Sequence, residues 1–178
     1  MDGSDYTLKA AVRWASSPAT DRDEGRPMLS ITPFLWFDTQ AEEAMQFYTS
    51  IFPRSTVVAV HRNGDQVMSV TWELEGQRFM GLNAGPHFAF NEAVSFFVSC
   101  ETQQEVDELW DKLLAGGGKP TQCGWLKDRF GLSWQIIPDA LPRLIGDPDR
   151  AKAGRAMQAM VGMVKIDAAA LQRAFDGA

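Results

Sequence analysis

The stretch Ile31–Tyr48, ITPFLWFDTQAEEAMQFY, returns 63 residues later as Val94–Asp111, VSFFVSCETQQEVDELWD. Each copy begins with a short apolar run that predicts a strand, at Ile31–Phe37 and at Val94–Ser99. Apolar residues at helical spacing follow in both copies and predict an amphipathic helix. A strand and a helix that recur in this way predict two modules of one architecture.

The helix of each copy is expected to begin at a repeated tetrapeptide. Thr39-Gln40-Ala41-Glu42 in the first copy corresponds to Thr102-Gln103-Gln104-Glu105 in the second. In a capping box the threonine hydroxyl accepts from the N3 amide, and the glutamate accepts from the cap amide. The sequence therefore predicts that the two helices, Gln40–Phe52 and Gln103–Leu114, begin alike.

Three further strands are predicted after each helix. In the first module they are Ser55–His61, Gln66–Leu74 and Gln77–Leu82, and in the second they are Lys119–Cys123, Trp125–Asp128 and Leu132–Ile137. The pairs Asn63-Gly64 and Glu75-Gly76 are typical of tight hairpin turns. The predicted fold class is α+β, with paired βαβββ modules followed by C-terminal helices.

This pattern divides the chain into three parts. Residues 1–28 are polar and irregular and predict a flexible arm. Residues 29–138 form the paired domain, with modules at 29–84 and 93–138. Residues 139–178 form a helical extension, in which Asp147 and Pro148 open a methionine-rich helix to about Val164 and Asp167 caps a last helix to Phe175.

Composition excludes several classes of partner. The net charge is -6 and the basic residues are scattered, so nucleic acid is not expected. No apolar run reaches the ~20 residues that a membrane span needs, and the start lacks a signal-peptide core. The two cysteines, Cys100 and Cys123, form neither a metal-binding spacing nor a disulfide framework. We expect a cytoplasmic protein that binds neither nucleic acid nor a membrane.

Strand alternation selects the side chains that would line a concave side, here called the cup. We assign to the cup the residues on one face of the first and last strands of each module. Trp125 is added as a further aromatic wall. The candidate ligand-binding residues are therefore Thr32, Phe34, Trp36, Asn83, Ser95, Phe97, Trp125 and Gln135. By the offset of the repeat, Thr32 corresponds to Ser95.

The sequence resembles the PhnB-like branch of the vicinal-oxygen-chelate superfamily, which includes glyoxalases, dioxygenases and bleomycin-resistance proteins. The branch is often labelled demethylubiquinone methyltransferase. The resemblance covers Leu29 to about Gly177, and it is carried by ITPFLWF at 31–37, AEEA at 41–44, CGWLKDRFGLSWQ at 123–135 and KIDAAAL at 165–171.

The resemblance implies a divalent metal on four ligands in the cup. By position those ligands fall on Thr32, Gly81 or Asn83, Ser95 and Gln135. Hydroxyls and amides cannot balance the charge of such an ion. We therefore expect no metal and no cofactor, with no assigned catalytic residue. His61 and His87 are expected to be exposed rather than ligating.

Two functions stay open from the sequence. Aromatic walls with neutral donors and acceptors suit a planar or apolar small molecule, which favours a binding protein. The alternative is an enzyme of lyase, isomerase or dioxygenase type. A methyltransferase is not favoured, because Gly116-Gly117-Gly118 follows a helix rather than a strand. The apolar stripe Met157, Met160, Val161 and Val164 predicts a homodimer.

Overall fold

The computed structural model describes residues 29–178 and divides into two compact units, with the boundary after His87. The first unit holds the first module, and the second unit holds the second module with the C-terminal extension. The predicted arm at residues 1–28 lies outside the described residues.

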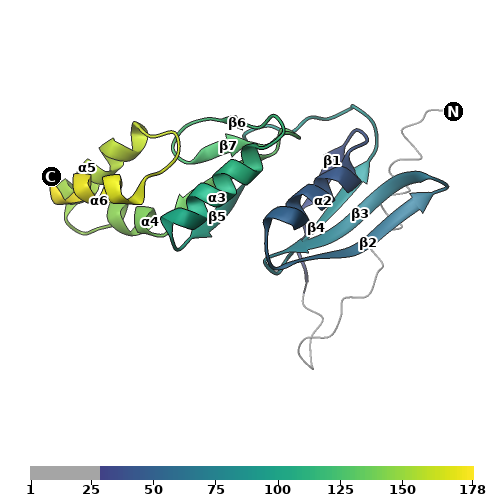
Figure 1. Cartoon of the computed structure of the whole chain (residues 1–178), viewed down its shortest axis with the longest axis horizontal. Coiled ribbons are helices and arrows are strands. Elements are labelled where there is room, and N and C mark those ends of the chain that lie inside the picture. The colour runs from purple at the N-terminus through teal and green to yellow at the C-terminus, as the bar shows by residue number, and fades with distance from the viewer. Residues whose placement is uncertain (1–28) are drawn as a thin grey trace, which may run out of the picture. The chain divides into compact units, whose positions relative to one another are not determined.

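Both modules have the predicted βαβββ order (Figure 1). The first consists of β1 (Phe34–Phe37), α2 (Ala41–Ile51), β2 (Ser55–Asn63), β3 (Gln66–Leu74) and β4 (Gln77–Asn83). The second consists of β5 (Ser95–Cys100), α3 (Gln103–Leu114), β6 (Lys119–Pro120), β7 (Trp125–Lys127) and β8 (Ser133–Pro138). The sheet orders are β1-β4-β3-β2 and β5-β8-β7-β6, with the first pair of each sheet parallel and the others antiparallel. The α+β fold class is confirmed.

The core of the first module is a stack of aromatic rings between α2 and its sheet. Trp72 lies 6.2 Å from Tyr48 and 5.6 Å from Phe79, both as stacked rings. Gly81 leaves room for this stack, because a Cβ at this position would lie 3.1 Å from Val70 and 3.2 Å from Trp72. These contacts fix which face of β3 and β4 is covered by the helix.

The core of the second module lies between α3 and the face of β5, β7 and β8 that carries Trp134. The Trp134 ring lies 5.4 Å from that of Phe96, and Leu126 pairs with Trp134 in the register of β7 and β8. Val106 and Leu113 of α3 are fully buried. Trp134 is thus a core residue, as strand alternation predicts.

The two helices do not begin alike. The capping box of α3 is present, with Thr102 Oγ1 accepting from the Glu105 amide at 3.2 Å. In α2 the cap residue is Gln40, and no side chain of the tetrapeptide caps the helix. Asn83 of β4 caps α2 instead, because its Oδ1 accepts from the Ala41 amide at 2.8 Å. The predicted first capping box is therefore wrong.

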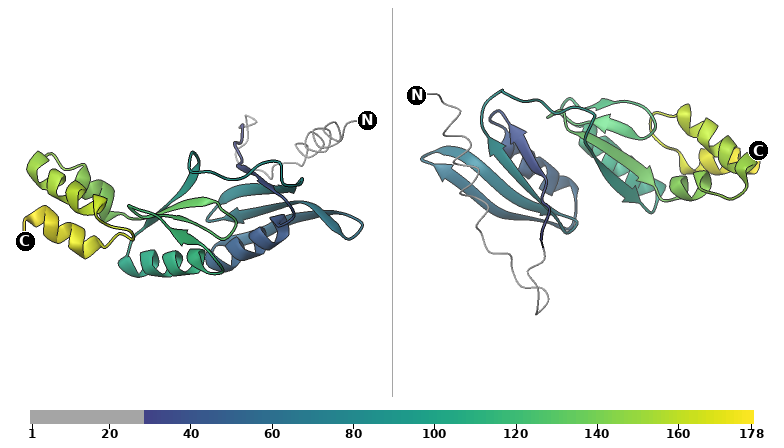
Figure 2. Two further views of the ribbon diagram at one scale, coloured as in Figure 1. Left: turned by 90° about the horizontal axis from the view of Figure 1, so that it is seen from above. Right: turned by 180° about the vertical axis from the view of Figure 1, so that it is seen from behind.

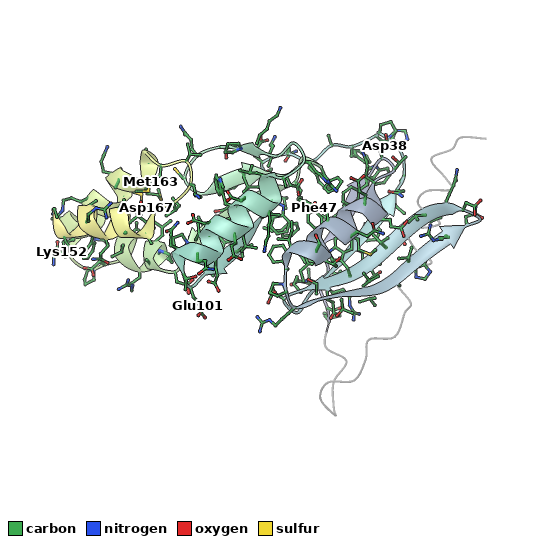
Figure 3. The ribbon with its side chains drawn as sticks, viewed as in Figure 1. Asp38, Phe47, Glu101, Lys152, Met163 and Asp167 are labelled. Atoms are coloured by element: carbon green, nitrogen blue, oxygen red, sulfur yellow. The ribbon has the colours of Figure 1, made fainter. Side chains whose placement is uncertain are left out.

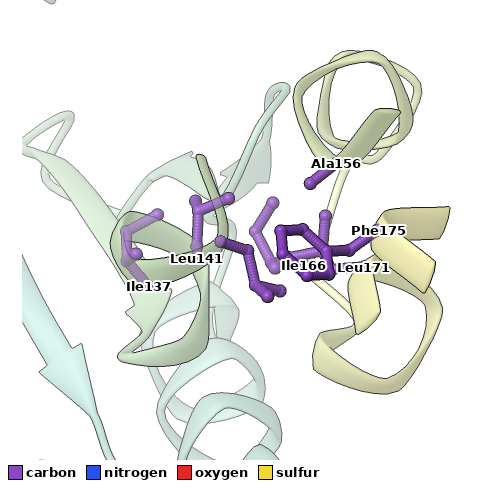
Figure 4. Close-up of a cluster of buried hydrophobic side chains, with 7 residues drawn as sticks. Ile137, Leu141, Ala156, Ile166, Leu171 and Phe175 are labelled. Carbon is purple, nitrogen blue, oxygen red and sulfur yellow. The ribbon is translucent and has the colours of Figure 1, made fainter. Parts of the chain in front are cut away.

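The extension contains α4 (Ala140–Ile145), α5 (Arg150–Val161) and α6 (Ala168–Asp176). Its core is the cluster of Figure 4: Ile137, Leu141, Leu144, Ala156, Ile166, Leu171 and Phe175. Asp167 caps α6 as predicted, by accepting from the Ala170 amide. The cap of α5 is Asp149 rather than Asp147, since Asp149 accepts from the two amides of the first turn.

The extension packs on the second module of its own chain. Met163, which lies between α5 and α6 (Figure 3), accepts from the Cys123 amide at 2.8 Å. Gln103 of α3 accepts from the Ala168 amide and donates to the Ile166 carbonyl. A Cβ on Gly124 would lie 2.6 Å from Ile137, so this close approach requires glycine. None of the helices in residues 29–178 has the length and apolar character needed to cross a membrane.

Candidate functional site

The candidate site is the face of the second sheet that points away from α3, here called the open face of the second sheet (Figure 2, left). Two rows of cross-strand partners define it. The amide row is Phe97, Gln135 and Trp125, and the cation row is Ser95, Ser133, Lys127 and Lys119. Side chains of paired residues share a face, so each row runs across the sheet on one side.

Four residues predicted from the sequence come together on this face. Gln135 Nε2 donates to Ser95 Oγ at 2.9 Å, which joins the two rows. Phe97 and Trp125 are the cross-strand neighbours of Gln135. The Phe97 side chain is 55% exposed, and Trp125 is half-buried. The face therefore presents two aromatic rings on either side of a hydrogen-bonded amide.

The ion pair of this face was missed in the sequence. Lys127 Nζ lies 2.5 Å from Glu92 Oε1, and Glu92 belongs to the loop that precedes β5. Lys127 lowers the pKa of the Glu92 carboxyl from its usual value, chiefly by donating a hydrogen bond to it. Strand alternation from Trp125 could have placed Lys127 on this face, but nothing in the sequence pattern indicates its partner.

A buried carboxylate holds the turn between β7 and β8. Asp128 is 3% exposed, and its Oδ1 accepts from the amides of Phe130 and Leu132 at 2.9 and 3.0 Å. Its Oδ2 accepts from Trp134 Nε1 at 2.9 Å. Hydrogen bonds to a charged group are the stronger kind. Asp128 thereby fixes the two residues that flank the turn on the open face, Lys127 and Ser133.

The corresponding face of the first sheet differs in chemistry. Phe34 pairs with Met80 where Phe97 pairs with Gln135, so Met80 is the counterpart of Gln135. Trp36 Nε1 donates to the Gly85 carbonyl at 2.8 Å, and its ring meets His87 edge to face. Thr32 is half-buried and precedes β1.

Asn83 does not lie on the face assigned to it from the sequence. It pairs with Phe37, which is buried under α2, and its Oδ1 caps that helix. Its Nδ2 donates to the Val67 carbonyl at 3.0 Å. Both ends of the amide are therefore engaged on the helix-covered side, and Asn83 is left out of the site.

The donor set does not fit a divalent metal ion. Three of the ligand positions that the resemblance implies carry Thr32, Ser95 and Gln135, and at the fourth the register gives Met80 in place of the expected Gly81 or Asn83. None of these side chains is a strong metal ligand. Within residues 29–178 no three histidine, cysteine, aspartate or glutamate side chains gather where they could hold a metal.

Neither cysteine belongs to the two rows that define the open face of the second sheet. Burial, with the nearby charges of Glu105 and Asp139, raises the pKa of the Cys100 thiol to about 11. Cys123 is half-buried, and its Sγ lies 3.7 Å from the Met160 carbonyl oxygen of the extension. A raised pKa leaves the Cys100 thiol with little thiolate near pH 7.

Comparison with known proteins gives the family. The model of the 3-demethylubiquinone-9 3-methyltransferase family matches residues 29–137. A 3-demethylubiquinone-9 3-methyltransferase-like PhnB protein from Bacillus cereus is 36% identical over 62% of this chain and 99% of its own, with a TM-score of 0.58. Protein PA1353 from Pseudomonas aeruginosa is 21% identical over 62% of this chain and 98% of its own, with a TM-score of 0.55.

No curated protein is significantly similar to the chain. The matched region ends before α4, so α4 to α6 extend beyond the family's model. The match covers more than half of the chain and confirms the PhnB-like resemblance. The chain belongs to the 3-demethylubiquinone-9 3-methyltransferase family.

Proposed function

We propose that the chain is a small-molecule-binding protein and that the open face of its second sheet takes flat, mostly apolar ligands. The main support for this proposal is the Ser95–Gln135 hydrogen bond, which lies beside the exposed ring of Phe97. Exposed aromatic rings at this density are typical of interaction sites. The side chains of Ser95 and Gln135 make no other hydrogen bond within residues 29–178, so a ligand can still meet both.

The other three residues predicted from the sequence, Thr32, Phe34 and Trp36, lie on or just before β1 of the first sheet. Phe34 is 44% exposed and shares its face with Trp36. The Trp36 indole N–H already donates to Gly85, so its ring rather than its N–H would meet a ligand. These three residues stay predictions for the ligand site.

The name of the family includes methyl transfer to a demethylated ubiquinone, and we do not extend that activity to this chain. A class I site for S-adenosylmethionine needs a glycine-rich turn directly after a parallel strand. Gly116 to Gly118 follow α3 instead and end that helix. The alternative is an enzyme of lyase, isomerase or dioxygenase type that uses the same open face. Such an enzyme would convert the bound molecule into a product, whereas a binding protein would release it unchanged.

The test is a titration with 2-naphthamide, a flat neutral probe, followed by tryptophan fluorescence and calorimetry. Loss of one neutral hydrogen bond costs about 1 kcal/mol, so Gln135→Leu should weaken binding about fivefold. Phe97→Ala should weaken binding further. The control is Phe88→Ala, which removes an exposed ring of the loop before β5. Unchanged affinity in both Phe97→Ala and Gln135→Leu would place the site elsewhere.

A homodimer is the second part of the proposal. Met157, Val161 and Val164 are exposed on and just after α5, whereas Met160 packs against the cluster of the extension. An exposed apolar stripe of this kind suits a contact between two copies. Light scattering at micromolar concentration should give twice the 19.7 kDa mass of one chain, and a single-chain mass would exclude the dimer.

A further inference from the structure

The cation row gives the open face a charge that the amide row lacks. Lys127 and Lys119 are cross-strand partners on β7 and β6, and Ser133 and Ser95 continue the row on β8 and β5. Two serines and two lysines therefore lie in one cross-strand row. Such a row matches the oxygen atoms of an anion.

The Ser133 hydroxyl is an independent indication that the cation row binds a hydrogen-bond acceptor. Its side chain is 1% exposed, and its Oγ has no hydrogen-bond partner within residues 29–178. An unpaired buried hydroxyl is costly, so native structures rarely leave one without a reason. Ser133 lies between Ser95 and Lys127 in the row, where a ligand oxygen would complete it.

Glu92 forms an ion pair with Lys127, next to Ser133 in this row. Its carboxylate lies 2.5 Å from Lys127 Nζ, and the side chains of Lys127 and Glu92 are 31% and 63% exposed. Exposed ion pairs contribute little stability because water and salt screen them. A second anion can therefore displace the Glu92 carboxylate from Lys127 at small cost.

We propose that the ligand is a flat ring that carries one carboxylate-sized anionic group. The ring lies over Gln135, flanked by Phe97 and Trp125, and the anionic group replaces the Glu92 carboxylate at Lys127. Ser133 Oγ donates to the same group. This inference rests on the proposed function, since it specifies the ligand of the same face.

The test compares two probes of equal shape, 2-naphthoate and 2-naphthamide, by calorimetry on the full chain at low salt. Wild-type protein should bind naphthoate about tenfold more tightly. Lys127→Met should remove this preference and keep the affinity for naphthamide. Glu92→Gln should strengthen naphthoate binding severalfold, because the competing carboxylate is gone. The matched control is Lys112→Met on α3, whose lysine pairs with Glu108.

The outcomes separate the two proposals. Equal affinities for the two probes in wild-type protein, or a preference that survives in Lys127→Met, would overturn the anionic ligand and leave the binding site in place. Binding of neither probe would overturn both. If Lys127→Met fails to fold, the Glu92→Gln variant decides, because unchanged naphthoate affinity there contradicts the displacement.

Discussion

The two modules share one topology and place different charges at the same position of the sheet. In the first module Glu73 and Arg78 are cross-strand partners that form an ion pair at 2.8 Å. The second module has Lys127 and Ser133 in this register, and the counter-charge comes from Glu92 of a loop. At this position the first sheet therefore supplies both charges of its ion pair, whereas the second sheet supplies only the cation. Two modules of the same topology thus have different side-chain chemistry at equivalent positions.

The last hairpin of each module is also held differently. The turn of the first module uses backbone conformation, with positive φ at Glu75 and Gly76. The turn of the second also has a positive φ, at Gly131, but adds the buried carboxylate of Asp128. We expect Asp128→Ala to lower the free energy of unfolding by about 3 to 5 kcal/mol, because several buried donors lose a charged acceptor.

The matched variant for this turn is Gly76→Ala, which should cost about 1 kcal/mol because alanine resists positive φ. Urea unfolding of both variants measures the difference. If Asp128→Ala proved no more costly than Gly76→Ala, the carboxylate would not hold the second hairpin.

The start of α2 gives the next largest expected effect. Asn83→Ala leaves the Ala41 amide and the Val67 carbonyl without their partner, and it should cost about 2 kcal/mol. Urea unfolding is again the measurement, with the exposed Asn91→Ala of the loop before β5 as control. A cost below that of the control would remove Asn83 as the cap of α2.

Cys100 in the second module lies at the position that Phe37 has in the first. Because a thiol can lose a proton, the free energy of unfolding should depend on pH at this position. The pKa of the Cys100 thiol is raised to about 11, so the folded state holds this proton more tightly than the unfolded chain. The stability it contributes is present below the ordinary thiol pKa of 9.0 and is lost as pH rises toward 11.

Urea unfolding at pH 8 and pH 10.5 tests this contribution. Wild-type protein should lose about 1 to 2 kcal/mol more than Cys100→Ala over this interval. Equal losses in the two proteins would show that the thiol does not titrate differently in the folded state.

The smallest expected difference in stability is between the two threonines of the repeated tetrapeptide. Thr102→Ala removes a capping hydrogen bond and should cost about 1 kcal/mol, whereas Thr39→Ala should cost only a few tenths. Thermal and urea unfolding of this pair is the measurement. Equal costs would mean that α2 uses its own threonine after all.

Periodicity was sufficient to predict the βαβββ order of both modules, the core role of Trp134 and the positions of Ser95, Phe97, Trp125 and Gln135. The offset of the repeat does not extend to the fourth strand, because β2 and β3 have nine residues each while β6 and β7 have two and three. The face of that strand was therefore assigned by alternation alone. A shift of one residue exchanges the faces of a strand, so Asn83 was assigned to the wrong side.

Long-range partners explain the other misses. Asn83 caps α2 from a strand 42 residues away, and Glu92 reaches Lys127 from a loop. Neither contact leaves a local pattern in the sequence. Helix α4 was missed for a different reason, since its six residues are too few to show a helical period.

We propose that the second sheet, rather than the first, carries the main ligand site. The most direct measurement is an NMR titration of labelled protein with 2-naphthoate. We expect the largest shifts at the amides of Phe97, Trp125 and Gln135. Largest shifts at their counterparts in the first module, Phe34, Thr71 and Met80, or no localised shifts at all, would contradict a ligand site on the second sheet.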